Sequence, residues 1–105
     1  MDNGMSVIVL KLCERYEEKA KESINRFRVL SMIAAIREEH VNWPVDKANR
    51  WIGFIQGVLF AEQLIDLNEE RDITRPMFHE YYKLMGLEVP KTIDVESIGY
   101  LVDDD

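Results

Sequence analysis

Apolar and polar positions in the first forty residues repeat with the period of an α-helix. From Ser6 to Glu39 the chain contains neither proline nor glycine. Apolar or small residues recur in steps of three and four, at Val9, Cys13, Tyr16, Ala20, Ser23, Phe27, Leu30 and Ala34. Residues at this spacing share one face of a helix. The pattern predicts one long helix over residues 6–39, with a possible break near residues 23–25.

A second helix is predicted to follow a short connection. His40, Asn42 and Pro44 are expected to end the first helix, because the residue before a proline is pushed out of the helical region. The carboxylate of Asp46 can then accept hydrogen bonds from the free amides of a new first turn. We expect this second helix to run to about Ile65.

The second predicted helix is apolar on nearly all sides, with Gln56 as the one polar residue between Trp51 and Ala61. This stretch is far shorter than the roughly 20 residues that cross a bilayer. We therefore expect neither a membrane span nor a membrane partner. Because both sides of such a helix must be covered, a second copy of the chain is one candidate cover. Its bulky residues form one face and are Trp51, Ile55, Val58 and Ile65.

Gly53, Gly57 and Ala61 form a second, shallow face on this helix, called here the small-residue strip. Each glycine inside a helix costs about 1 kcal/mol relative to alanine, so two of them require a compensating gain. Close approach of another helix backbone is the usual gain. The strip predicts self-association, and hence a homodimer or larger homo-oligomer.

A third helical region is predicted after residue 65. Asp66 followed by Glu69 has the form of an acidic capping box that opens a short helical turn. Thr74-Arg75-Pro76 predicts a new helix with proline in its first turn, running to about Met85 and ending at Gly86. The expected fold is all-α: one domain over residues 1–105, about three helices, and an extended acidic tail over residues 88–105.

Composition narrows the class of protein. With 105 residues, 47% apolar and 31% charged, the chain has the size and composition of one globular domain. The single Cys13 excludes an internal disulfide, and no signal peptide is recognisable, so a reducing cytoplasm is expected. The net charge of −7 comes largely from residues 76–105, and no basic stripe is present. Direct nucleic-acid binding is therefore not expected.

Two pairs of carboxylates stand at helical spacing: Glu14 with Glu17, and Glu69 with Asp72. All-α nucleoside triphosphate pyrophosphohydrolases hold magnesium with paired carboxylates of this kind, on facing helices. Here a complete predicted helix separates the two pairs, which departs from that pattern. A magnesium-dependent hydrolase that uses these four residues is kept as an alternative, and solvated helix faces as the simpler explanation.

Arg71, Arg75 and His79 recur every four residues beside the helix start predicted at Thr74. Free amides and two guanidinium groups could hold a phosphate, as in a protein that sequesters a phosphorylated nucleotide signal. The alternative is that both arginines form ordinary surface ion pairs. His40 and His79 lack metal-ligand spacing and Cys13 lies on the apolar face, so neither a metal nor another cofactor is expected. The acidic surface also leaves a DNA-mimic inhibitor open.

Residues 49–78, "NRWIGFIQGVLFAEQLIDLNEERDITRPMF", resemble a group of small tailed-bacteriophage proteins without an assigned activity. The shared pattern is W-[I/L]-G-F-[I/V]-Q-G-x-L followed by an acidic turn with an arginine. The matching positions are Trp51, Ile52, Gly53, Phe54, Ile55, Gln56, Gly57 and Leu59, then Glu69, Glu70 and Arg71. The resemblance implies an accessory viral protein in the cytoplasm of an infected bacterium.

The expected function is stoichiometric binding rather than enzymatic turnover. A phage accessory protein of this kind would inhibit or modulate a host enzyme or an anti-phage defence complex. The side chains expected to contact the host protein are Trp51, Gln56, Arg71, Arg75, His79 and Tyr82.

Overall fold

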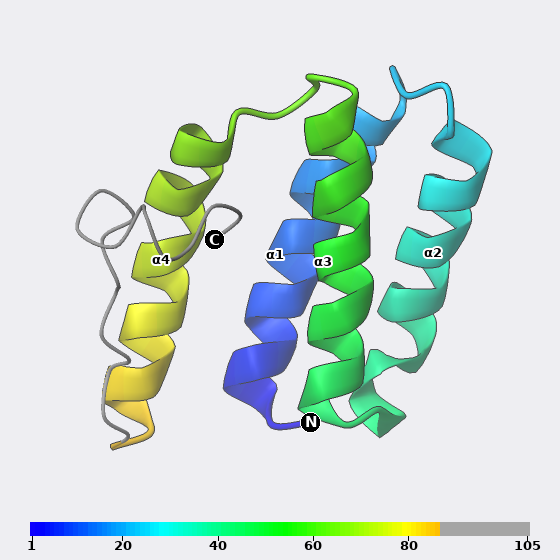
Figure 1. The fold of residues 1–105 in the computed structure, drawn as a ribbon. Helices are drawn as coiled ribbons and strands as arrows, with labels where there is room; N and C mark the ends of the chain where they lie inside the picture. Colours follow the sequence, from blue (N-terminus) through cyan, green and yellow to red (C-terminus); the bar gives the residue numbers. More distant parts are fainter. Residues whose placement is uncertain (87–105) are drawn as a thin grey trace, which may run out of the picture.

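The computed structural model describes residues 1–86 and contains four α-helices among them, where about three were predicted (Figure 1). They are α1 (Asn3–Ala20), α2 (Arg26–Glu39), α3 (Val45–Ala61) and α4 (Leu67–Leu84). A short 3₁₀ turn, η1 (His40–Asn42), joins α2 to α3. The predicted all-α class is confirmed, and the predicted tail over residues 88–105 lies outside the described residues.

The predicted first helix is broken, near the position that the sequence offered as an alternative. Residues 21–25 form a turn, and Glu62 at the end of α3 stabilises it. Its carboxylate accepts hydrogen bonds from the Ser23 hydroxyl at 2.8 Å, the Ile24 amide at 2.9 Å and the Asn25 side chain at 3.0 Å. A single uninterrupted helix over residues 6–39 is therefore wrong.

The turn also changes which residues of α2 face the core. The predicted apolar face is buried through Ser23, but Phe27 and Ala34 are exposed and Leu30 is only half-buried. Val29, Ile33 and Ile36 are buried instead. In the sequence, the helical spacing of apolar residues continues through the break. In the structure, the turn changes the orientation of α2, so that a different set of its residues faces the core.

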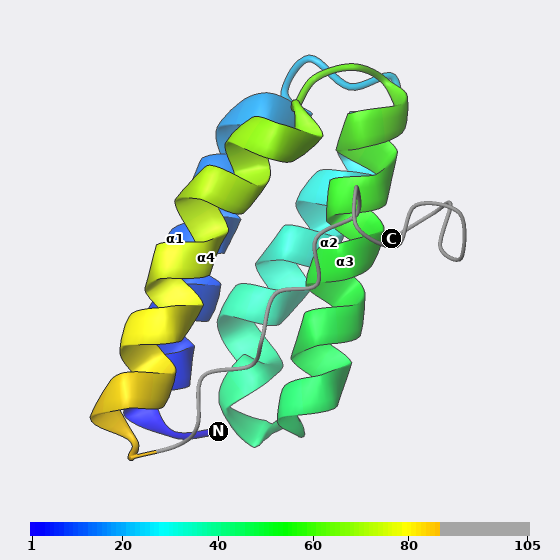
Figure 2. The same ribbon diagram turned by 60° about the vertical axis from the view of Figure 1, so that its left-hand side comes forward.

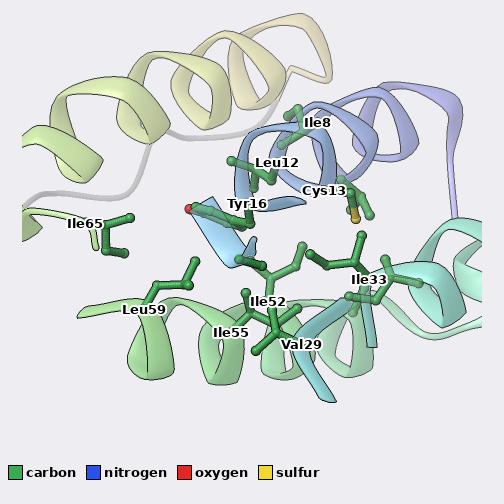
Figure 3. Packing of buried hydrophobic residues seen from close by; sticks show 14 of the residues in the cluster. Ile8, Leu12, Cys13, Tyr16, Val29, Ile33, Ile52, Ile55, Leu59 and Ile65 are labelled. Atoms are coloured by element: carbon green, nitrogen blue, oxygen red, sulfur yellow. The ribbon is translucent and has the colours of Figure 1, made fainter. Parts of the chain in front are cut away.

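α1 is the central helix of the fold. It packs against α2, α3 and α4, and α2 also packs against α3 (Figures 1 and 2). The buried core is formed mainly by aliphatic side chains of α1, α2 and α3 (Figure 3). Ten of the buried residues are Ile8, Leu12, Cys13, Tyr16, Val29, Ile33, Ile52, Ile55, Leu59 and Ile65.

The boundaries of α3 differ from the prediction at both ends. Pro44 is the residue that precedes the helix, with an extended backbone, and Asp46 lies inside the first turn. The predicted cap at Asp46 is therefore wrong, because its carboxylate is already within the helix. The helix ends at Ala61, and Gln63 turns the chain with a φ of 59°. Ile65 is buried but lies beyond the helix.

α4 is one continuous helix, so the predicted new helix start at Thr74 is wrong. Asp66 caps it as predicted, since its carboxylate accepts a hydrogen bond from the Glu69 amide at 2.9 Å. The helix continues through Pro76, and the Thr74 hydroxyl donates to the Glu70 carbonyl at 2.9 Å. Gly86 follows the helix with a φ of 71°, which agrees with the predicted stop.

None of the helices within residues 1–86 is both long enough and apolar enough to span a membrane.

Candidate functional site: the surface between α3 and α4

A buried polar cluster joins α1, α3 and α4. Glu70, in the first turn of α4, is only 4% exposed. One of its oxygens accepts hydrogen bonds from Nε and Nη2 of Arg15, at 2.8 and 2.5 Å. The other accepts from the Tyr16 hydroxyl at 2.7 Å, and the Gln56 amide donates to that hydroxyl at 2.8 Å. Both oxygens of this buried carboxylate are thus hydrogen-bonded, as a buried charge requires.

The cluster combines a charged guanidinium with a neutral phenol. The hydrogen bond to Glu70 raises the pKa of Arg15, with its partial burial acting in the opposite direction. Burial is the largest cause that raises the pKa of Tyr16, whereas the hydrogen bond from Gln56 lowers it. Tyr16 therefore stays protonated at neutral pH and remains the donor to the Glu70 carboxylate. Figure 3 shows its hydroxyl oxygen on the side of the core where Ile65 lies.

A pocket of about 250 Å³ lies between α3 and α4, beside this cluster. We call it the α3–α4 pocket. Gln56, Gly57 and Phe60 line it from α3, whereas Leu67, Arg71 and Thr74 line it from α4. Ile65 and Glu70 complete its wall. The pocket thus combines apolar side chains with an amide, a hydroxyl and a guanidinium, which is the mixture that specific binding surfaces use.

The small-residue strip is exposed along the outer side of α3. A Cβ atom added at Gly53 or Gly57 would meet nothing within 4 Å in the described part of the chain. No other helix within residues 1–86 therefore packs against this strip. Phe54 and Phe60 beside it are about half exposed, so the outer side of α3 is an accessible apolar surface. Self-association through Gly53, Gly57 and Ala61 stays a prediction.

The six side chains predicted to contact a partner lie in different places. Gln56 and Arg71 line the α3–α4 pocket. Arg75 and Tyr82 follow Arg71 at helical spacing on the same side of α4 and are half-buried. These four residues form one candidate surface.

His79 follows Arg75 at the same helical spacing and lies on the same side of α4, whereas Trp51 lies apart. His79 lines a separate depression near the end of α4, together with Lys83 and Leu84. Trp51 packs on Trp43, with ring centres 4.8 Å apart, near the opposite end of α3 from Phe60. Five of the six predicted residues therefore lie along the side of the molecule formed by α3 and α4, and Trp51 is separate from them.

The four carboxylates of the magnesium-dependent alternative do not come together. Glu17 forms an ion pair with Arg37 of α2, whereas Glu69 lies 3.8 Å from Arg15 on the side of α4. No group of three or more histidine, cysteine or acidic side chains within residues 1–86 could hold a metal ion. A magnesium-dependent site at Glu14, Glu17, Glu69 and Asp72 stays an untested alternative.

The structure lacks the free main-chain amides that the predicted anion site at Thr74 requires. Because α4 passes through Thr74 without a new start, the main-chain amides there belong to the helix interior and do not form a free first turn. Arg71 and Arg75 remain on one side of α4. A phosphate would have to be held by these side chains alone.

Cys13 and His40 are buried structural residues. Burial raises the pKa of the Cys13 thiol to about 11, which keeps it protonated and unreactive at neutral pH. The Nδ1 atom of His40 donates to the Ile36 carbonyl at 2.7 Å. The Nε2 atom of His40 forms a hydrogen bond with the Ser6 hydroxyl at 2.6 Å, so both ring nitrogens are paired.

Sequence reasoning missed Arg15, Tyr16 and Glu70 as one cluster. Arg15 and Glu70 lie 55 residues apart, and each was an unexceptional charge on a helix that was expected to be solvated. A possible signal was Tyr16 on the apolar face, because a buried phenol needs a polar partner.

Comparison with known proteins gives no relative from which a function could be transferred. No protein-family model matches the chain, and no curated protein or solved structure matches it either.

Proposed function

We propose that this protein acts by stoichiometric binding to another protein, and that the outer side of α3 together with the α3–α4 pocket forms the contact. The observation that carries the proposal is the accessible glycine-containing surface of α3. Gly53 and Gly57 leave open space where their Cβ atoms would be, within the described residues. Two glycines on this exposed face destabilise the helix, and close packing of another backbone against them would offset that cost.

The walls of the α3–α4 pocket support the same proposal. Phe60 and Leu67 are 50% and 42% exposed and offer apolar area to a partner. Gln56 is oriented by its hydrogen bond to Tyr16, and Tyr16 is fixed in turn by Glu70. Side chains that are already ordered before binding lose less entropy when a partner arrives.

The proposed partner is a host protein. The resemblance of residues 49–78 to tailed-phage proteins supports an accessory role in the cytoplasm of an infected bacterium, where a host enzyme or a defence complex would be inhibited or modulated. In this proposal the protein occupies a surface of its target and carries out no turnover.

Gly53, Gly57 and Ala61, the residues predicted to mediate self-association, lie on the same face of α3 as the proposed contact with the host protein. A second copy that covers this strip would compete with the host protein, because one face accommodates one backbone at a time. In that case the free protein is a homodimer that must dissociate before it binds. Binding should then weaken as the concentration of the protein itself is raised.

The test is affinity capture from bacterial lysate with the full chain and two variants. Gly57→Leu places a bulky side chain on the proposed contact surface. Ala34→Leu makes a comparable change on the exposed side of α2 and serves as the matched control. We expect the wild type and Ala34→Leu to retain the same host protein and Gly57→Leu to lose it.

The purified complex should then show a fixed molar ratio by calorimetry. Equal capture by Gly57→Leu would contradict the location of the contact. A captured protein without a fixed ratio would contradict stoichiometric binding itself.

A further inference from the structure

Two large apolar side chains project from the turn between α1 and α2. Ile24 is 86% exposed and Phe27 is 79% exposed. Isolated exposed apolar residues are common on proteins, but here two large ones lie three residues apart, Ile24 in the turn and Phe27 in the first turn of α2. We call Ile24 and Phe27 the apolar knob.

The knob is held in place by the main chain and by its polar neighbours. Glu62 accepts a hydrogen bond from the Ile24 amide at 2.9 Å and from the Ser23 hydroxyl at 2.8 Å. The guanidinium of Arg26 lies 4.9 Å from the centre of the Phe27 ring. The two apolar side chains are thus presented to solvent by an ordered turn, which lowers the entropic cost of inserting them into a partner.

The charge around the knob is opposite in sign to the charge of the whole protein. Positions 19–28 contain Lys19, Lys21, Arg26 and Arg28 against Glu22. Two further carboxylates lie at this turn, because Glu18 pairs with Lys21 and Glu62 accepts hydrogen bonds from Ser23 and Ile24, so the cations exceed the acids by one. The chain as a whole carries a net charge of −7. A partner for the knob should therefore offer an apolar depression bordered by carboxylates.

This protein has such a depression at the same end of the molecule. A hollow of about 610 Å³ surrounds the segment between α3 and α4. Phe60, Leu64 and Ile65 supply its apolar lining, and Asp66 and Glu69 supply two carboxylates. The Glu69 side chain is 62% exposed and so is accessible to a cation from outside.

The positions of knob and hollow suit a two-fold axis. Both views place the turn between α1 and α2 and the segment between α3 and α4 at one end of the bundle, side by side (Figures 1 and 2). If a second copy meets this end after a rotation by a half turn, each knob faces the hollow of the other copy. An interface of this kind closes on itself and stops at a dimer.

We propose that the protein forms a symmetric end-to-end dimer, in which Ile24 and Phe27 of each copy insert into the hollow beside Phe60 and Ile65 of the other. Arg26 then lies against Glu69 across the interface, twice per dimer. An anionic lipid surface fits this end less well, because it would meet the carboxylates of Asp66 and Glu69 as well as the cations. This contact shares Ala61 with the small-residue strip, because Ala61 also lines the hollow, but Gly53 and Gly57 lie outside the hollow.

Sedimentation of the full chain over a range of concentrations tests the dimer. We expect Ile24→Ser/Phe27→Ser to raise the dimer dissociation constant roughly a hundredfold, as for loss of a central apolar anchor. Both side chains are exposed in the monomer, so the helical content should not change. Leu84→Ser is the matched control, because Leu84 is also 79% exposed but lies at the other end of the molecule.

Charge reversal tests the symmetry. Arg26→Glu and Glu69→Lys should each weaken the homodimer by about tenfold or more. A mixture of the two variants should form a heterodimer with nearly the wild-type affinity, because both of its contacts again pair opposite charges. The thermal unfolding of each variant at low concentration reports any damage to the monomer.

Three results would overturn the proposal. The first is a wild-type protein that sediments as a monomer. This result counts against the dimer also if the monomer uses the knob to bind anionic vesicles or another protein. The second is a dimer that is insensitive to the knob variants and is lost with Gly57→Leu, which would assign self-association to the small-residue strip. The third is a mixture of charge variants whose affinity is not restored.

Discussion

α1, α2 and α3 are joined by fully buried apolar packing, whereas α4 is joined to them by a buried polar cluster and by apolar side chains that stay half-buried. Within residues 1–86, the first three helices contribute fourteen of the sixteen buried apolar residues, with Trp43 and Ile65 outside them. Among the described residues of α4 only Glu70 is fully buried. Met77, Phe78 and Tyr81 of α4 pack on the core but stay half-buried.

Because of this difference, mutations in the two parts should affect stability in different ways. Apolar packing tolerates small displacements, whereas a buried carboxylate depends on every one of its hydrogen bonds. The bundle of α1, α2 and α3 should therefore lose stability in proportion to the volume removed. The attachment of α4 should instead be lost when one partner of Glu70 is removed.

The largest effect is expected in the core of the three-helix bundle. Leu12→Ala removes a side chain that is 1% exposed and should lower the free energy of unfolding by about 3–4 kcal/mol. Denaturant unfolding followed by circular dichroism measures it. Leu10→Ala on the exposed side of the same helix is the control, and an equal loss there would remove the distinction between core and surface.

A somewhat smaller and local effect is expected at the polar cluster. Glu70→Ala leaves Arg15 and Tyr16 without their shared partner and should weaken the attachment of α4 by about 3 kcal/mol. Hydrogen exchange should then accelerate in α4 while the amides of α1, α2 and α3 remain protected. Glu69→Ala is the control, since its contact with Arg15 is long and exposed. Uniform acceleration in all helices would show that α4 does not separate from the rest.

Substitution of the glycines of α3 should stabilise the isolated chain. Gly53→Ala and Gly57→Ala should each raise the free energy of unfolding by about 1 kcal/mol, because alanine favours the helix and its Cβ meets no described atom within 4 Å. Thermal unfolding at low protein concentration measures the gain. A loss of stability would mean that the strip is covered in the free protein.

The smallest effect concerns acid stability at the turn between α1 and α2. Hydrogen bonds from Asn25 and Ser23 lower the pKa of Glu62 below its ordinary value of 4.5. A carboxyl with a lowered folded-state pKa stabilises the fold above its unfolded pKa, and this contribution is lost as the pH falls through the folded pKa. Unfolding between pH 6 and pH 2 should therefore be less pH-dependent in Glu62→Gln than in the wild type. In Glu22→Gln we expect no such change.

Local features of the fold were predictable from the sequence where one helix turn determines them. The cap at Asp66 and the stop at Gly86 depend on neighbouring residues, and both predictions agree with the structure. The apolar face of α1 could also be read from its spacing, because one straight helix preserves the period.

Features that depend on long-range contacts were not predictable in the same way. The orientation of α2 depends on Glu62, which is 37 to 39 residues away from the turn that it stabilises. The contact between Arg15 and Glu70 likewise joins two helices that no local pattern relates. The candidate site was found in part, since Gln56 and Arg71 were expected there, but the cluster that orients Gln56 was not.

The position of the tryptophans determines what fluorescence can report. The chain contains two tryptophans, and their rings pack on each other with Lys47 positioned 4.3 Å from the Trp43 ring centre. Trp43 follows η1 and Trp51 lies in the first half of α3, and the junction of η1 with α3 is at the opposite end of the bundle from the start of α4 (Figure 1). Intrinsic emission should consequently remain native-like when α4 alone separates and change only when the three-helix core opens. A discrepancy between emission and circular dichroism during unfolding would then measure the population of that partly opened state.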